Sequence, residues 1–144
     1  WMEDMHEYCN VSYYRDGVDP EQAAFSLSLR EFRRERPWLM QNFREGESLD
    51  RLHIDGSVIF FGWRRAPAEA AIPNEELLFI CNMEGAPYTL TPSALPLGAL
   101  SADGWEPALV VPTLHYQVAA GTLAFDHEIT LHDSEGVVFR RVER

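Results

Sequence analysis

A local cluster of potential metal ligands lies near the C-terminal end of the sequence. His127 and His132 stand there among Asp126, Glu128 and Asp133. A zinc site needs three or four ligands brought together by tight spacing, and this group has neither an i, i+4 helical pair of histidines nor a Cys-x-x-Cys motif. On a strand, the two histidines would point to opposite faces. We therefore predict solvent-exposed polar residues here, with no metal site and no cofactor.

Paired carboxylates could carry out glycoside hydrolysis, which requires two acidic side chains with different pKa values. The obvious groups of acids in the sequence are Glu3 with Asp4, Glu75 with Glu76, and Asp133 with Glu135. We expect each pair on a surface turn or tail, where no apolar surroundings raise the pKa of one carboxyl group. Ser134 lacks the Gly-x-Ser-x-Gly elbow of a hydrolase nucleophile. No residue is therefore predicted to be catalytic.

Aromatic side chains offer another kind of chemistry, because their rings can stack on sugar rings. Most tryptophans in a domain of this size belong to the core, and we expect this of Trp63 and Trp105. Tyr13, Tyr14 and Arg15 differ, since they lie in an irregular stretch just before a helix. Loops on a rigid scaffold often carry function, so these three are the candidate binding residues.

Composition limits the partners of the chain. Its 144 residues suit one domain, and twelve basic against twenty-three acidic side chains give a net charge of -11. This charge repels nucleic acid and anionic membranes, whereas a neutral ligand remains compatible with it. No apolar run is long enough to span a membrane. We predict no nucleic-acid or membrane partner.

The N-terminal residues and the cysteines indicate the cellular location expected for the chain. The first residues lack the basic and apolar regions of a signal peptide, and the chain does not begin with methionine. We therefore expect a segment of a longer polypeptide. Cys9 and Cys81 stand in different contexts and have no catalytic pattern around them, so we expect two reduced thiols and a cytoplasmic location.

A helix is predicted for residues 20–36. Asp19 provides an N-cap and Pro20 the first helical position, and Phe25, Leu29 and Phe32 recur on one face. Pro37 ends the helix. Residues 1–45 thus form a loop and a helix, too few to hold a core of their own.

Residues 46–144 have the pattern of a β domain. Residues 76–83 contain a continuous apolar run that predicts a central strand covered on both faces. Asp55-Gly56 is a strong hairpin signal between strands at residues 49–54 and 58–63. Further strands are predicted at residues 88–90, 105–111, 114–119, 121–125, 128–131 and 137–142. The expected fold class is mainly β, an antiparallel β-sandwich preceded by one α-helix.

Three segments together resemble the C-terminal end of an α-amylase family glycoside hydrolase. They are Leu-Arg-Glu-Phe-Arg-Arg-Glu-Arg-Pro-Trp-Leu at 29–39, Val-Ile-Phe-Phe-Gly-Trp-Arg-Arg at 58–65 and Leu-Leu-Phe-Ile-Cys-Asn at 77–82. The resemblance implies the last helix of a (β/α)8 barrel followed by a C-terminal β-sandwich. The family's catalytic carboxylates lie on earlier barrel strands, so none is carried over. Tyr13, Tyr14 and Arg15 would then border the sugar site of the intact enzyme.

The leading functional hypothesis is a non-catalytic accessory portion of an enzyme that acts on α-glucosidic bonds. Its partner would be the catalytic barrel of the same protein, with a neutral α-glucan or α-glucoside as a further candidate. The alternative is a self-standing carbohydrate-binding or protein-interaction β-sandwich module. A small independent enzyme would need a carboxylate pair or metal cluster that the sequence does not predict.

Overall fold

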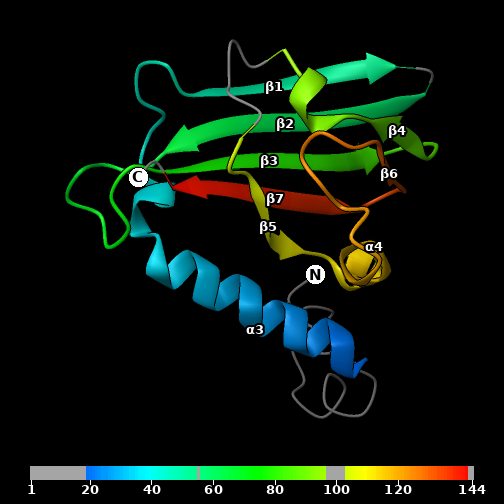
Figure 1. Cartoon of the computed structure of the whole chain (residues 1–144), viewed down its shortest axis with the longest axis horizontal. Helices are drawn as coiled ribbons and strands as arrows, with labels where there is room; N and C mark the ends of the chain where they lie inside the picture. Colours follow the sequence, from blue (N-terminus) through cyan, green and yellow to red (C-terminus); the bar gives the residue numbers. More distant parts are fainter. Residues whose placement is uncertain (1–18, 55, 97–102, 143–144) are drawn as a thin grey trace, which may run out of the picture.

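The fold is mainly antiparallel β-structure. The computed structural model describes residues 19–54, 56–96 and 103–142. Among these, one sheet is formed by β1 (Ser48–Ile54), β2 (Ser57–Arg65), β3 (Glu75–Glu84), β5 (Glu106–Val110) and β7 (Gly136–Val142). Its order is β1-β2-β3-β7-β5, with every pair antiparallel (Figure 1). A second, two-stranded sheet pairs β4 (Tyr88–Leu90) with β6 (Ile129–Leu131). The predicted sandwich-like β fold with one main helix is confirmed.

Strand β3 lies in the middle of the larger sheet, as its apolar run predicted. Leu77 and Leu78 are both completely buried, although neighbouring residues of a strand point to opposite faces. Leu78 belongs to the cluster under the smaller sheet, and Leu77 to the cluster on the helix side. Both faces of β3 are therefore covered at this point.

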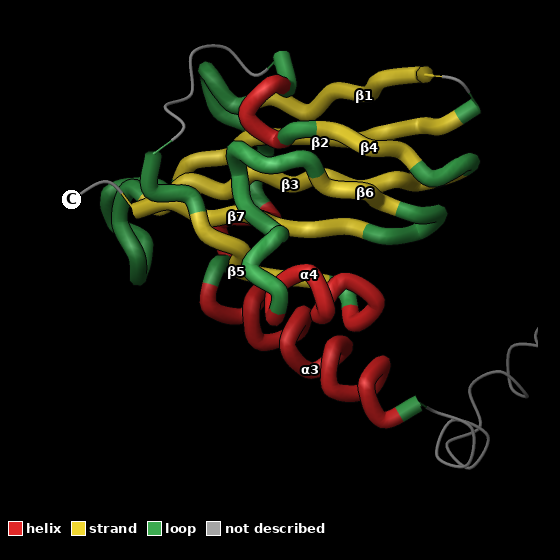
Figure 2. The backbone as a smooth tube through the Cα atoms, turned by 45° about the vertical axis from the view of Figure 1, so that its right-hand side comes forward, coloured by secondary structure: helices red, strands yellow, loops and turns green. Residues whose placement is uncertain are grey.

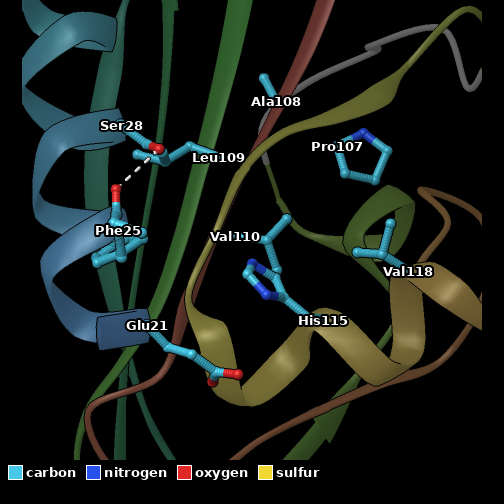
Figure 3. Close-up of a pocket in the computed structure, with 10 residues that line it drawn as sticks. Glu21, Phe25, Ser28, Pro107, Ala108, Leu109, Val110, His115 and Val118 are labelled. Carbon is cyan, nitrogen blue, oxygen red and sulfur yellow. Dashed lines mark hydrogen bonds between the residues drawn. The ribbon is translucent and has the colours of Figure 1, made fainter. Parts of the chain in front are cut away.

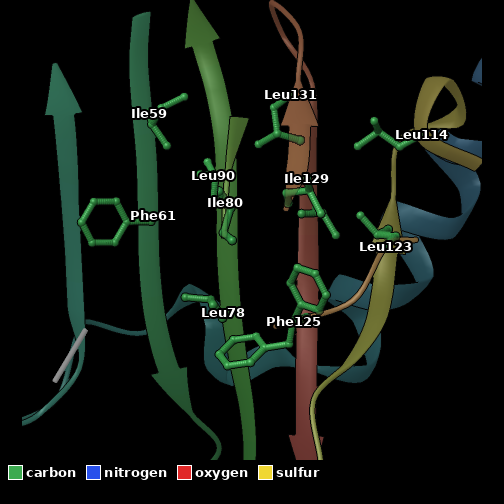
Figure 4. Packing of buried hydrophobic residues seen from close by; sticks show 12 residues of the cluster. Ile59, Phe61, Leu78, Ile80, Leu90, Leu114, Leu123, Phe125, Ile129 and Leu131 are labelled. Atoms are coloured by element: carbon green, nitrogen blue, oxygen red, sulfur yellow. The ribbon is translucent and has the colours of Figure 1, made fainter. Parts of the chain in front are cut away.

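The main hydrophobic core lies between the two sheets. Strands β4 and β6 run in front of the larger sheet (Figure 2), and Figure 4 shows side chains of both layers meeting between them. Phe125 stacks on Trp105 with ring centroids 4.9 Å apart and meets Phe139 edge-on at 5.9 Å. Trp105 thus packs against the core as expected, while Trp63 is half-buried in β2.

The predicted hairpin between β1 and β2 is confirmed. Ile54 pairs with Ser57, so two residues connect the strands. Gly56 has a φ of 82°, which glycine adopts without steric cost. A Cβ atom on Gly85 would lie 1.9 Å from the Gly56 carbonyl oxygen, so close backbone contact requires glycine there as well.

Helix α3 (Pro20–Glu35) starts at the predicted residue. The Asp19 carboxylate caps it by accepting a 3.0 Å hydrogen bond from the Glu21 backbone N–H. A 3-10 turn, η1 (Pro37–Met40), follows and buries Trp38 beside Phe32, Leu77 and Val138. Of the sixteen residues of α3, all of them described, Phe32 alone is buried. The helix is therefore anchored to the sheet mainly at its C-terminal end.

The predicted strands at residues 114–119 and 121–125 are wrong. A 3-10 turn, η3 (Pro112–Leu114), leads instead into a short helix, α4 (His115–Ala119). Proline at the first position favours such a turn. A further 3-10 turn, η2 (Pro92–Ala94), lies after β4.

The burial and hydrogen bonds of this segment explain the error. Leu114 and Gln117 are buried three residues apart, a helical spacing that the mixed sequence pattern obscured. The backbone N–H groups of Thr122 and Leu123 both donate to the Gln117 carbonyl oxygen, at 2.9 and 3.2 Å. Residues 121–125 thus follow the end of α4 as irregular backbone, and Leu123 and Phe125 fill the core without joining a described strand.

Asn82 joins the two sheets. Its side-chain amide is completely buried and donates to the carbonyl oxygens of Leu131 and Ala86, both at 3.0 Å. The sequence placed Asn82 only within the predicted central strand at residues 76–83, whereas the structure places its side chain between the two sheets.

Replacing Asn82 with alanine should therefore lower the free energy of unfolding by about 1–2 kcal/mol, because the buried bond to the Leu131 carbonyl oxygen is lost, whereas the Ala86 carbonyl oxygen keeps a 2.8 Å hydrogen bond from the Ser57 hydroxyl. Chemical denaturation of the 144-residue chain measures this loss. Thr89→Val is the control, since Thr89 shares an exposed 2.7 Å hydroxyl bond with Thr130 on the smaller sheet. Equal losses in the two variants would contradict the joining role of Asn82.

Candidate functional site

The carboxylates of Glu75 and Glu76 are buried, contrary to the prediction of a surface turn. Their exposed fractions are 0% and 3%. Glu75 accepts hydrogen bonds from Nε and Nη2 of Arg36, at 2.7 and 2.8 Å, whereas Glu76 accepts from Arg141. Because the two are neighbours in β3, they point to opposite faces of the sheet. They form two separate ion pairs and not a catalytic acid pair.

The charged state of Arg36 is stabilised by its partner. Burial disfavours the charged guanidinium, but hydrogen bonds and attraction to Glu75 outweigh this, so that the pKa of Arg36 lies above its ordinary value. The guanidinium also lies 4.0 Å from the centre of the Phe32 ring. These contacts tie the end of α3 to β3.

Glu135 was also predicted on a surface turn, and this too is wrong. Its side chain is 8% exposed and accepts a 2.7 Å hydrogen bond from the backbone N–H of His132. His127, His132 and Asp133 are exposed, in accord with the polar surface expected for them. Across the residues with described positions, no group of three or more potential ligands is arranged to hold a metal ion.

Cys81 has a free thiol on β3. Burial raises the pKa of this thiol, which disfavours the reactive thiolate. Its sulfur lies 3.4 Å from the Met83 sulfur. A packing role fits these contacts better than a nucleophilic one.

A groove separates α3 from β5 and α4. Its volume is about 400 Å³. The residues that line it are Glu21, Ala24, Phe25, Ser28, Pro107, Ala108, Leu109, Val110, His115 and Val118. Figure 3 shows the Glu21 side chain at the lower end of the groove and His115 rising from α4 on the other wall.

The polar groups of this groove differ in their bonding. The Ser28 hydroxyl donates to the Ala24 carbonyl oxygen at 3.1 Å, within its own helix. The side chains of Glu21 and His115 make no hydrogen bond or ion pair with any residue that the structure describes. The Glu21 carboxylate can therefore accept hydrogen bonds from a ligand on one wall of the groove, and the His115 imidazole can donate or accept on the opposite wall.

A second, more apolar surface lies on the other flank of α3, over the sheet face that points away from β4 and β6. It includes a groove of about 460 Å³ lined by Leu29, Met40, Phe43, Leu49, Gly62 and Phe79, among others. An adjoining hollow of about 560 Å³ is bordered by Arg30, Arg33 and Arg34. We call this surface the arginine-rimmed face, consisting of Leu29, Met40, Phe43 and Leu49 with Arg30, Arg33 and Arg34.

The arginine-rimmed face exposes large apolar side chains. Met40 is 71% exposed, Leu49 59% and Phe43 48%. Beneath them, the buried Arg64 guanidinium lies 4.5 Å from the Phe43 ring centre and donates to the Leu39 carbonyl oxygen at 2.9 Å. The exposed apolar residues therefore lie over a buried arginine that is fixed by a hydrogen bond and a ring contact.

A model of the protein family described as hypothetical glycoside hydrolase 5 matches residues 1–139. The chain belongs to this family. No curated protein and no solved structure matched it. Membership of the hypothetical glycoside hydrolase 5 family confirms the predicted relation to glycoside hydrolases and supports a carbohydrate-related function. It does not single out the α-amylase family, which stays a prediction.

The candidate binding residues Tyr13, Tyr14 and Arg15 lie outside the described residues, so their role stays a prediction. Sequence reasoning missed the groove beside α3. Glu21 was not singled out as a binding residue within the predicted helix at residues 20–36, and His115 was placed in the predicted strand at residues 114–119. No local motif joins them, because the fold alone brings α3 next to α4.

Neither helix with a described position is both long and apolar enough to cross a membrane.

Proposed function

We propose that this chain is a non-catalytic accessory portion of a glycoside hydrolase or transglycosidase that acts on α-glucosidic bonds. It packs against the catalytic barrel of the same protein. Family membership supports the link to glycoside hydrolases. The α-glucosidic specificity and the barrel partner rest on the resemblance of residues 29–39, 58–65 and 77–82 to the end of an α-amylase family enzyme.

The arginine-rimmed face is the observation that carries the proposal. Contiguous apolar patches on soluble monomers are generally small, and larger ones mark interaction sites. Helix α3 adds to this argument, because a helix with one buried residue gains little from the packing that usually stabilises helices. A partner surface that covers α3 and the open sheet face would bury the exposed apolar side chains and would also give the helix the packing that it lacks.

The charges of the arginine-rimmed face indicate the chemistry of that partner. Three arginines gather along one part of α3 in a chain whose net charge is -11. Carboxylates on the barrel surface would complement them, whereas a basic surface would be repelled.

The arrangement of the buried acids supports a non-catalytic role. Glycoside hydrolysis needs two carboxyl groups facing one another across the scissile bond. The buried carboxylates of Glu75 and Glu76 are instead each bonded to an arginine and lie on opposite faces of β3. In the proposed enzyme, the barrel provides the catalytic acids.

Leu49 provides a test. In the polypeptide that contains both barrel and chain, Leu49→Glu should uncouple them, because docking would bury an unpaired carboxylate. Calorimetry should then resolve two unfolding transitions in place of one. In the isolated chain the same change should alter the melting temperature little, since Leu49 is 59% exposed.

Leu49→Met is the matched control, since it keeps the apolar surface and should retain a single transition. Identical calorimetric traces for the two variants would argue against docking through this face. A gene that encodes no barrel before residue 1 would refute the accessory role and favour the self-standing module.

A further inference from the structure

The groove between α3, β5 and α4 adjoins the apolar groove of the arginine-rimmed face at Leu109, which lines both, but otherwise has different walls. The two surfaces flank α3 on different sides, and the α3 residues that line them differ: Glu21, Phe25 and Ser28 line the groove, whereas Leu29 and Arg33 belong to the face. A ligand in the groove would therefore leave Leu29, Met40, Phe43 and Leu49 of the proposed docking surface uncovered.

The size of the groove suits a small ligand. Its volume of about 400 Å³ falls within the range of about 300–1,000 Å³ that small-molecule sites occupy. Its walls come from a helix, a strand and a short helix, so the shape is set by regular elements (Figure 3).

The floor of the groove is apolar. Phe25 is half-buried on the α3 side, and Pro107 and Val110 of β5 form the base with Val118 of α4 nearby (Figure 3). The C–H faces of a pyranose ring are apolar and can pack on such side chains.

The two polar groups limit the class of ligand further. Glu21 can only accept hydrogen bonds when ionised, and the His115 imidazole can donate or accept. Neither has a partner within the described part of the chain. Hydroxyl groups match both, because each hydroxyl can donate to the carboxylate or exchange a bond with the imidazole. Among the described residues that line the groove there is no arginine, so a phosphate or other anion would meet the Glu21 carboxylate without a guanidinium to compensate it.

We propose that this groove binds a short neutral saccharide, with Glu21 and His115 bonding to ring hydroxyls and Phe25 and Pro107 contacting a sugar face. The saccharide class rests on the proposed function, since the family's link to glycoside hydrolases is what favours sugars among neutral polyhydroxylated ligands. The site is an additional sugar-binding position without a catalytic role, because the described residues that line it include a single carboxylate, that of Glu21.

The test is isothermal titration calorimetry of the 144-residue chain with maltotriose, and with cellotriose as a second probe. We expect saturable binding of maltotriose in the millimolar range. Glu21→Ala and His115→Ala should each weaken it about fivefold to tenfold, the effect of losing one hydrogen bond. Both side chains are exposed, so the variants should fold normally, which circular dichroism verifies.

Matched controls are Glu31→Ala on the same helix and His127→Ala before β6, both exposed and outside the groove. Neither should change the affinity. No saturable heat with either sugar, or binding that survives both groove substitutions, would overturn the proposal. Tight binding of cellotriose alone would keep the groove as a sugar site but count against α-glucosidic specificity.

The outcome is separable from that of the Leu49 experiment. If groove binding fails while Leu49→Glu still uncouples the barrel, the accessory role stands without the sugar site. If the groove binds sugar and no barrel precedes the chain, the accessory role fails and the groove stands.

Discussion

Replacing Arg36 with methionine is expected to lower the free energy of unfolding by about 3–5 kcal/mol, because it leaves a buried carboxylate without its partner. Glu75 has an exposed fraction of 0% and Arg36 one of 4%. The guanidinium holds the carboxylate with two hydrogen bonds, at 2.7 and 2.8 Å. It also donates to the Phe32 carbonyl oxygen at 3.2 Å, near the end of α3. Urea denaturation of the chain measures the change.

The double variant Arg36→Met/Glu75→Met distinguishes loss of a partner from loss of packing. Without either charge, the site resembles an apolar core, and most of the lost stability should return. Arg34→Met is the surface control, since Arg34 is exposed on the same helix. A loss below about 1 kcal/mol for Arg36→Met would show that water reaches Glu75 and that the pair contributes little.

The parts of the fold that the sequence predicted correctly have local causes. The α3 start follows from Asp19 and Pro20, and the β1–β2 turn from the residue pair at 55–56. The central position of β3 follows from its unbroken apolar run, because only a strand covered on both faces keeps such residues from water. Each signal lies within a few neighbouring residues.

The errors concern residues whose state depends on distant partners. Two adjacent glutamates are typical of a surface turn. The burial of Glu75 and Glu76 becomes possible only through their ion pairs with Arg36 and Arg141. Residues 114–125 alternate loosely enough to suggest strands, yet core packing selects the helical turn around Gln117. Long-range pairing of this kind leaves no mark on local sequence pattern.

The candidate site, too, has one part that is visible in the local sequence and another that depends on residues far apart in the chain. The sequence places Arg30, Arg33 and Arg34 in the predicted helix, and the structure adds the apolar neighbours Met40, Phe43 and Leu49 that turn them into the rim of a surface. The groove depends on the α4 segment lying across from α3. Because that segment was predicted as a strand, the groove could not be foreseen.

The carboxylate of Glu47 organises the connection between η1 and β1. It is 2% exposed and accepts hydrogen bonds from the Arg64 side chain at 3.0 and 3.1 Å. The backbone N–H groups of Arg44 and Arg65 also donate to it, at 2.8 and 3.0 Å. Burial alone would raise the pKa of this carboxyl, but these donors outweigh it and hold the pKa below its ordinary value.

Glu47→Gln should therefore destabilise the chain at neutral pH by about 2–3 kcal/mol, since the amide cannot accept from all of these donors and leaves Arg64 without its counter-charge. Arg64 keeps its bonds to the Leu39 and Asn42 carbonyl oxygens, which limits the loss. Thermal and urea unfolding measure the difference, with exposed Glu45→Gln as the control.

The pH dependence of this difference follows from the lowered pKa. A carboxyl whose pKa is lower in the folded than in the unfolded chain contributes its full stability above the unfolded value, about 4.5, and loses it as the pH falls through the folded value. The gap between wild type and Glu47→Gln should be constant from about pH 6 to 8 and narrow below about pH 4.5. Protonation of Glu47 in the folded chain must remove the advantage of the carboxylate over the amide. A stability difference that stays constant down to pH 3, or one that widens on acidification, would therefore mean that the charge of Glu47 does not stabilise this connection.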